Sequence, residues 1–117
     1  VLGLTFKPNT DDMRDAPSLD IVPALQGMGA TVQAFDPEGT HEARQLLRGV
    51  DFKDNAYEAA AGADALVIIT EWDQFRALDL ERVKNSMKSP VLVDLRNIYK
   101  PEEVRSRGFK YASVGRA

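Results

Sequence analysis

The sequence contains no cysteine, which excludes disulfide bonds, thiolate metal sites and a cysteine nucleophile within its 117 residues. It has a single histidine, His41, which is too few for a histidine-based metal site. No apolar run approaches the roughly 18 residues of a membrane-spanning helix, and nothing at the start resembles the cationic region of a signal peptide. A net charge of −3 provides no basic field for nucleic acid or an anionic membrane. An anion bound by this chain must therefore be held by a few local cations.

The sequence also lacks an initiator methionine and opens inside an apolar run, VLGL, so we expect a piece of a longer polypeptide. Its 117 residues are enough for one compact domain with one hydrophobic core. We find no internal repeat, low-complexity tract or long linker, and we therefore treat residues 1–117 as a single domain.

Apolar runs alternate with segments of helical periodicity along the chain. Strands are predicted at residues 1–5, 31–35, 50–53, 65–70, 90–95 and 109–114, and helices at residues 17–28, 41–47, 57–61, 79–87 and 101–107. The runs ALVIIT and PVLVDL are continuously apolar, which is typical of parallel strands buried on both faces. This order predicts an α/β fold, a three-layer α/β/α Rossmann-like domain whose mostly parallel sheet has about five to six strands.

The connection between the first strand and the first helix, TFKPNTDDMRDAPS, is crowded with charge. It leaves the carboxyl end of a strand, where parallel α/β sheets bind their ligands. Lys7 and Arg14 suit a phosphate, and the ring of Phe6 suits a planar base or a sugar face. Three carboxylates can orient these cations: Asp11, Asp12 and Asp15. A solvated turn whose charges neutralise one another fits the same spacing.

Five motifs carry a resemblance to a known family: GLTFKPNTDDMRDAPS at residues 3–18, AFDP at 34–37, ALVIITEWDQF at 65–75, VDLRNIY at 93–99 and SVGR at 113–116. In this order they resemble the C-terminal, UDP-binding domain of the UDP-glucose/GDP-mannose dehydrogenase family, over essentially the whole chain. The NTDDMR form is more similar to members that act on UDP-glucose than to those that act on GDP-mannose or UDP-N-acetylmannosamine.

The resemblance implies a four-electron oxidation of UDP-glucose to UDP-glucuronate with two NAD in sequence. In the family a cysteine elsewhere in the chain carries the covalent intermediates, so this piece alone is expected to be inactive. By motif position, Phe6, Lys7 and Arg96 match residues that bind the UDP-sugar, and Arg14 matches the arginine that reaches the NAD pyrophosphate. No residue here is assigned to catalysis or to a metal. The implied partners are the N-terminal and central domains of the same enzyme, in a cytoplasmic homo-oligomer.

Two further signals favour structural roles. Asp36 ends a strand, where a dinucleotide-binding fold places the acid that holds an NAD ribose, but the first turn lacks the phosphate-binding glycines. We therefore interpret Asp36-Pro37 as turn chemistry. Thr70 and Asp73 have the spacing of a helix capping box, which we prefer over a binding role. Glu71 and Trp72 follow the same strand, and we assign them no contacts.

A phosphoacceptor receiver domain is the alternative of a different class. It has a similar length and α/β alternation, and Asp11-Asp12, Thr70 and Lys100-Pro101 superficially match its acidic pair, threonine and lysine. The acidic pair follows the first strand only after a six-residue loop, however, and no aspartate follows a buried third strand. Acetyl phosphate separates the two hypotheses, because a receiver domain acquires an acyl phosphate.

Overall fold

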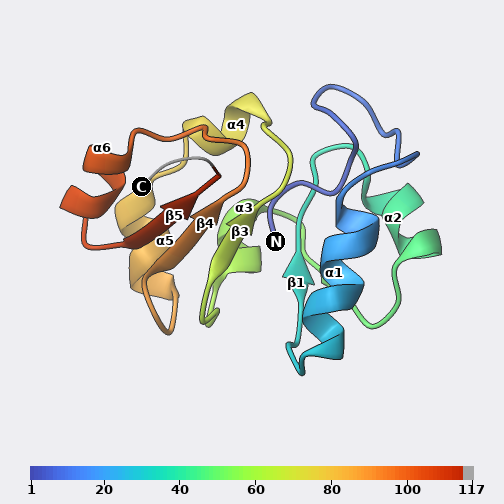
Figure 1. The fold of residues 1–117 in the computed structure, drawn as a ribbon, viewed down its shortest axis with the longest axis horizontal. Coiled ribbons are helices and arrows are strands. Elements are labelled where there is room, and N and C mark those ends of the chain that lie inside the picture. Colours follow the sequence, from blue (N-terminus) through green and yellow to red (C-terminus); the bar gives the residue numbers. More distant parts are fainter. Residues whose placement is uncertain (115–117) are drawn as a thin grey trace.

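The computed structural model describes residues 1–114 and has the predicted α/β alternation (Figure 1). The last two residues of the SVGR motif, 115 and 116, lie outside this range. The strands are β1 (Gln33–Ala34), β2 (Asp51–Phe52), β3 (Leu66–Ile68), β4 (Val91–Asp94) and β5 (Lys110–Ser113). The helices are α1 (Ser18–Gly27), α2 (Thr40–Leu46), α3 (Ala56–Ala60), α4 (Asp73–Arg76), α5 (Leu80–Ser86) and α6 (Pro101–Ser106). Each predicted segment from residue 17 onward is present within a few residues, and α4 was not predicted.

The strands are parallel throughout, in a pair β1–β2 and a triplet β3–β4–β5. The first predicted strand, residues 1–5, lies between the two groups and joins them through Leu2, which forms isolated parallel bridges to Phe35 and Ile68. The Leu2 amide donates to the Val67 carbonyl at 2.8 Å, and the Gly3 amide donates to the Phe35 carbonyl at 2.9 Å. The spatial order is therefore β2, β1, the Leu2 segment, β3, β4 and β5. The strand order reverses beside the Leu2 segment, as in dinucleotide-binding folds.

Gly3 explains why this central segment is not a regular strand. Its φ is +87°, a value that residues with a Cβ atom rarely adopt. A Cβ built there lies only 2.5 Å from the Thr70 Cβ. The backbone therefore passes very close to the end of β3. The prediction of a single sheet with a regular first strand is corrected accordingly, to five named strands in two sheets joined at Leu2.

Helices cover both faces of this sheet, which confirms the three-layer class (Figure 1). One buried cluster joins α3, α4, α5 and α6 to alternate positions of β3, β4 and β5; it includes Leu66 and Ile68 of β3, Leu92 of β4 and Phe75 of α4. The second cluster joins α1 and α2 to β1 and to the first residues of the chain. No helix within residues 1–114 is long and apolar enough to cross a membrane.

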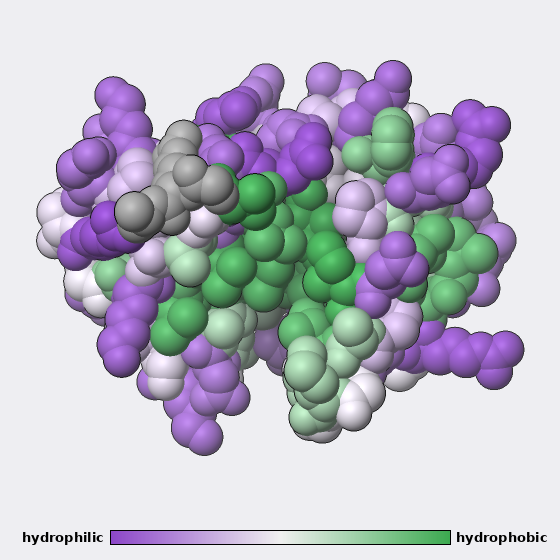
Figure 2. All heavy atoms as spheres, in the orientation of Figure 1, coloured by the Kyte–Doolittle hydropathy of each residue, from purple (hydrophilic) through white to green (hydrophobic). Residues whose placement is uncertain are grey.

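The side of the molecule that carries α1 is only partly covered. Val67, Val91 and Val93 are half-buried and alternate with fully buried neighbours along β3 and β4. Figure 2 shows a hydrophobic band across the middle of this view, with hydrophilic side chains along its upper edge. The loop of residues 5–16 and α4 lie along that upper edge, at the carboxyl ends of the strands (Figure 1).

Candidate functional site

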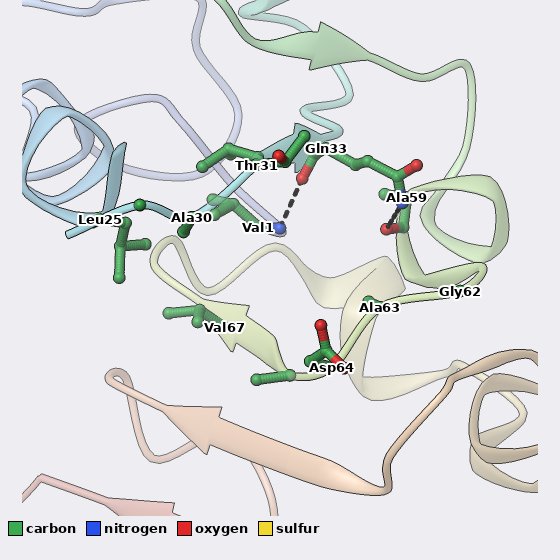
Figure 3. Close-up of a pocket in the computed structure, with 13 residues that line it drawn as sticks. Val1, Leu25, Ala30, Thr31, Gln33, Ala59, Gly62, Ala63, Asp64 and Val67 are labelled. Atoms are coloured by element: carbon green, nitrogen blue, oxygen red, sulfur yellow. Dashed lines mark hydrogen bonds between the residues drawn. The ribbon is translucent and has the colours of Figure 1, made fainter. Parts of the chain in front are cut away.

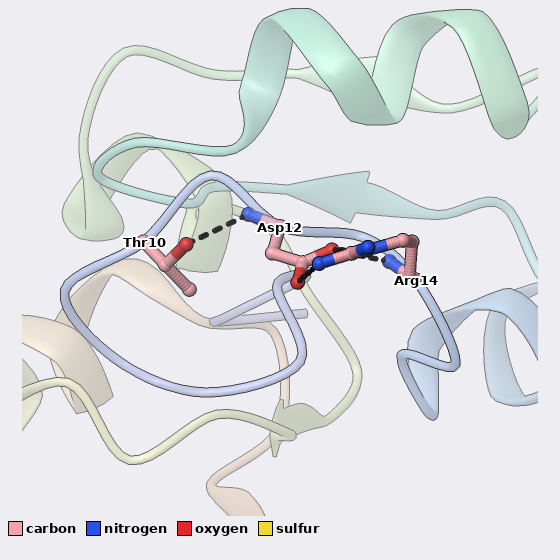
Figure 4. A network of polar contacts seen from close by, with 3 residues as sticks. All are labelled: Thr10, Asp12 and Arg14. Carbon is pink, nitrogen blue, oxygen red and sulfur yellow. Dashed lines mark hydrogen bonds and ion pairs between the residues drawn. The ribbon is translucent and has the colours of Figure 1, made fainter.

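The loop of residues 5–16 is folded back on itself. The Phe6 amide donates to the Asp12 carbonyl at 2.9 Å, which closes the loop, and the Thr5 hydroxyl donates to the Lys7 carbonyl at 3.1 Å. The Thr10 hydroxyl accepts from the Asp12 amide at 3.1 Å (Figure 4). These short-range bonds hold the loop together, and Met13 and Ala16 anchor it in the core.

Arg14 and Asp12 form a two-pronged ion pair in this loop (Figure 4). Arg14 Nε and Nη2 donate to the two carboxylate oxygens at 3.1 and 3.0 Å, and the Arg14 amide donates to the same carboxylate at 2.9 Å. The side-chain hydrogen bond from Arg14 is the main cause that lowers the pKa of Asp12 to about 2, and the charge of Lys7 contributes to it. The Arg14 side chain remains 89% exposed. The prediction that loop carboxylates orient the cations is confirmed for this pair.

Phe6 and Lys7 lie at the carboxyl end of the first segment and are both exposed, Phe6 to 48%. The Lys7 ammonium makes no hydrogen bond or ion pair with any residue of 1–114, unlike Arg14. An exposed aromatic ring beside a cation without such a partner is available to a ligand that combines a planar base with a phosphate.

Arg96 follows β4, and a buried acid fixes its backbone. Asp94 is fully buried, and its Oδ1 accepts from the Arg96 amide at 3.1 Å. Asp94 Oδ2 accepts from the Tyr99 amide at 3.1 Å and from the Tyr111 hydroxyl at 2.8 Å. Burial, together with the nearby Asp94 carboxylate, raises the pKa of Tyr99, whose hydroxyl donates to the Phe75 carbonyl. Asp94 thus holds the turn that carries Arg96.

The Arg96 side chain forms an ion pair with Glu71, which follows β3. Arg96 Nε lies 2.5 Å from Glu71 Oε2, and the Arg96 side chain is 40% exposed. Within residues 1–114 no acceptor forms a hydrogen bond with its terminal nitrogens, Nη1 and Nη2. The sequence did not reveal this ion pair or the hydrogen bonds that Asp94 accepts. The available signal was an acidic residue inside the apolar run PVLVDL, because a buried carboxylate needs hydrogen-bond donors.

The carboxyl edge is held together by two more buried polar groups. Thr70 is 1% exposed, and its hydroxyl donates to the Thr5 carbonyl at 2.7 Å. The capping-box interpretation of Thr70 is therefore wrong: Trp72 stands at the N-cap of α4 and makes no side-chain capping bond. Asp36 is 2% exposed and accepts the amides of Leu4 and Thr5. Its Oδ1 accepts the amides of Glu38 and Gly39, which confirms its turn role.

Three charged residues of the candidate site lie along one edge of the sheet. Lys7 extends from the Leu2 segment, Glu71 from β3 and Arg96 from β4, and these three segments are adjacent in the sheet. Trp72, beside Glu71, has the one buried side-chain nitrogen or oxygen of residues 1–114 that lacks a hydrogen-bond partner. Within the same range, no cluster of metal-ligating side chains is present.

Two hollows flank the sheet, and they differ in chemistry. One, of about 700 Å³, lies beside the charged loop and includes Arg14, but also the carboxylates of Asp11, Asp12 and Glu42. The other, of about 480 Å³, lies at the amino ends of the strands, where the Val1 amine donates to the Gln33 carbonyl at 2.8 Å (Figure 3). No lysine or arginine lines this second hollow. It is the better enclosed of the two, but it lacks the cations that a phosphorylated ligand needs, and we place the candidate site at the opposite edge.

Comparison with known proteins gives one consistent result. Residues 1–101 match the model of the UDP-glucose/GDP-mannose dehydrogenase family, UDP binding domain. The chain is 64% identical over 116 residues to a UDP-glucose 6-dehydrogenase of Rhizobium meliloti (strain 1021), covering 99% of this chain and 26% of that protein. It is 44% identical over 117 residues to UDP-glucose 6-dehydrogenase TuaD of Bacillus subtilis (strain 168), covering 99% of this chain and 25% of that protein. The chain therefore spans about a quarter of the length of these relatives.

Two solved structures share the fold. The NDP-N-acetyl-D-galactosaminuronic acid dehydrogenase of Methanosarcina mazei Go1 superposes with a TM-score of 0.84 at 30% identity, covering 98% of this chain and 24% of that one. A UDP-glucose dehydrogenase from Pyrobaculum islandicum superposes with a TM-score of 0.79 at 29% identity, covering 99% of this chain and 24% of that one.

Proposed function

The chain belongs to the UDP-glucose/GDP-mannose dehydrogenase family as its UDP-binding domain, and on this premise we propose that it binds the UDP part of UDP-glucose at the carboxyl edge of its sheet. The longer enzyme then oxidises UDP-glucose to UDP-glucuronate with NAD. The 64% and 44% identities to proteins named UDP-glucose 6-dehydrogenase support this substrate. The resemblance to a dehydrogenase of an N-acetylated sugar is at 30% identity and favours that alternative less.

The single observation that carries the proposal is that the terminal N–H groups of Arg96 are unoccupied within residues 1–114. Its backbone is fixed by Asp94, its Nε is engaged by Glu71, and its terminal nitrogens have no partner within residues 1–114. A fixed guanidinium with free N–H groups matches the oxygens of a diphosphate. Lys7 adds a second cation at the same edge, and Phe6 offers its ring to the base or the ribose.

NAD belongs to the proposal through Arg14. When bound, NAD supplies the acceptor for the hydride that leaves the sugar. Arg14 is 89% exposed and fits a phosphate contact with the cofactor, although Asp12 engages two of its nitrogens. The chain has no GxGxxG loop and no cysteine, so its residues bind and orient, and the oxidation itself is assigned to other parts of the enzyme.

The remaining partners follow from the length of the relatives. We propose that this domain packs against the N-terminal and central domains of the same polypeptide, in a homo-oligomeric, cytoplasmic enzyme. The receiver-domain alternative is disfavoured by the acidic pair itself: Asp12 is bound to Arg14, and Thr70 is buried and bonded to backbone.

Calorimetry on the full-length enzyme tests these assignments. UDP and UDP-glucose should bind more tightly than GDP-mannose. Lys7→Ala and Arg96→Ala should each weaken UDP by about tenfold or more, as expected for the loss of a charged hydrogen bond. Arg14→Ala should weaken NAD by a similar factor and leave UDP unchanged.

Lys88→Ala is the matched control, because Lys88 is an exposed cation at the amino edge of the sheet. It should change neither ligand. If Lys88→Ala and Arg96→Ala weakened UDP binding equally, the loss would reflect net charge alone, and the assignment of the site would be overturned.

A further inference from the structure

Glu71 and Arg96 are 25 residues apart in the sequence and meet only because β3 and β4 are neighbours. The register pairs Ile68 with Asp94, so Glu71 lies three residues beyond the end of one strand and Arg96 two residues beyond the end of the other. The pair is partly shielded from solvent, with side-chain exposures of 24% for Glu71 and 40% for Arg96. It joins the carboxyl ends of two adjacent strands.

The backbone of Glu71 is held in place, as that of Arg96 is. Glu71 occupies the middle of a tight turn, in which the Trp72 amide donates to the Thr70 carbonyl at 3.0 Å. Thr70 is 1% exposed and Trp72 is 6% exposed, so buried residues flank Glu71 on both sides. The backbone that carries the Glu71 carboxylate is therefore ordered. Arg96 has the longer and the more exposed side chain of the two.

The contact uses one particular nitrogen of Arg96. A guanidinium has five N–H groups, of which one is on Nε and four are on the terminal nitrogens. Glu71 accepts from Nε at 2.5 Å, and no residue of 1–114 accepts from Nη1 or Nη2. The carboxylate thus binds Nε, and the two terminal nitrogens stay available to a ligand.

We infer that Glu71 is a positioning residue for nucleotide-sugar binding, which holds the Arg96 guanidinium by its Nε so that the terminal nitrogens face the diphosphate. The inference rests on the proposed function of Arg96 as a ligand contact. A carboxylate beside an anion site also repels the anion, so the opposite role, in which Glu71 competes with the ligand, predicts the opposite sign. Pre-orientation outweighs repulsion here, because a side chain fixed in advance loses less conformational entropy when the ligand binds.

Substitutions at Glu71 in the full-length enzyme test this role. Glu71→Ala should raise both the UDP dissociation constant and the KM for UDP-glucose by about tenfold, with a much smaller effect on kcat. Glu71→Gln should stay within about threefold of wild type, because the amide carbonyl still accepts from Nε. In an Arg96→Ala background, Glu71→Ala should add nothing further, since the residue that it positions is absent.

Asp73→Ala is the matched control. Asp73 lies two residues further on and forms an exposed ion pair with Arg76 at 2.8 Å, and its loss should leave KM unchanged. Tighter UDP binding by Glu71→Ala would identify a competitor and overturn the inference, as would a loss of equal size in the Arg96→Ala background. If Glu71→Ala lowered the melting temperature and left KM unchanged, the ion pair would be only a structural contact. If Arg96→Ala alone leaves UDP binding intact, the assignment of Arg96 fails instead.

Discussion

Asp36→Asn tests what holds the carboxyl edge of the sheet together. The Asp36 carboxylate is buried and accepts hydrogen bonds from four backbone amides, and the Thr5 hydroxyl is a fifth donor within reach. Oδ2 accepts from the Leu4 amide at 2.7 Å and from the Thr5 amide at 3.0 Å, and the Thr5 hydroxyl, 3.2 Å from Oδ2, shares its one proton between Oδ2 and the Lys7 carbonyl. Oδ1 accepts from the amides of Glu38 at 3.0 Å and Gly39 at 2.7 Å. A carboxylate has about four lone-pair sites, so Asp36 has no acceptor capacity left for a ligand.

The magnitude follows from the chemistry of the replacement. An Asn side chain has one acceptor oxygen and one NH₂ group, which must face either set of donors. The smaller loss turns the NH₂ group toward Glu38 and Gly39. Each hydrogen bond to a charged group contributes about 1.5–3 kcal/mol. Glu38 is an exposed residue, so we expect its amide to bond to water instead. We therefore expect Asp36→Asn to lower the free energy of unfolding by about 3 kcal/mol.

Thermal denaturation followed by circular dichroism measures this loss. The unfolding entropy of 117 residues is about 0.25 kcal/mol/K. Dividing the loss of about 3 kcal/mol by this entropy gives a fall in melting temperature of about 12 °C. Asp54→Asn is the control, because Asp54 is exposed and its side chain makes no hydrogen bond within residues 1–114. A shift below about 3 °C, or one equal to that of Asp54→Asn, would refute the role given to Asp36.

Three further predictions concern other parts of the same edge. Gly3→Ala should lower the melting temperature by several degrees or more, because its Cβ would lie 2.5 Å from a neighbouring side chain at a φ of +87°; Gly27→Ala in α1, which has open space around it, should not lower it. The Asp12 carboxyl should titrate near pH 2 by NMR, so its contribution to stability is present above about pH 4 and is lost as the pH falls toward 2. Arg14→Ala should return the pKa of Asp12 toward the ordinary value of 3.8, and an ordinary Asp12 pKa in the wild type would contradict the ion pair. Lys7→Ala should raise the KM for UDP-glucose in the full-length enzyme with a stability change within about 0.5 kcal/mol; the reverse outcome would make Lys7 a structural residue.

The sequence predicts most of the fold because its strongest signals are local. The runs ALVIIT and PVLVDL become β3 and β4, and they require no knowledge of the rest of the chain. The irregular first segment was not predictable in this way. Its cause is the close approach of Gly3 to Thr70, which is 67 residues away and becomes a neighbour only when the sheet forms. Helix α4 is short, with four residues, and offers too little periodicity to be recognised.

The candidate site was predictable to the level of its edge, but its pairings were not. Position after a strand places Lys7, Glu71 and Arg96 at the carboxyl ends, since all strands are parallel. Which of these side chains meet depends on the register between strands, and the sequence does not contain that register explicitly. The pairing of Ile68 with Asp94 decides that Glu71 faces Arg96.

Charged residues at this edge perform two different tasks, and burial separates them. Asp36 and Asp94 are buried, and their oxygens are occupied by backbone amides and hydroxyls, so they order the turns and cannot serve a ligand. Lys7 Nζ and the terminal nitrogens of Arg96 donate no hydrogen bond within residues 1–114, although ordered turns carry both residues. In the sequence, Asp36 and Arg96 look alike, because each is a charged residue at the end of an apolar run. Their difference lies in the number of donors and acceptors that folding brings to each, and on that ground we propose ligand binding for the cations and rigidity for the acids.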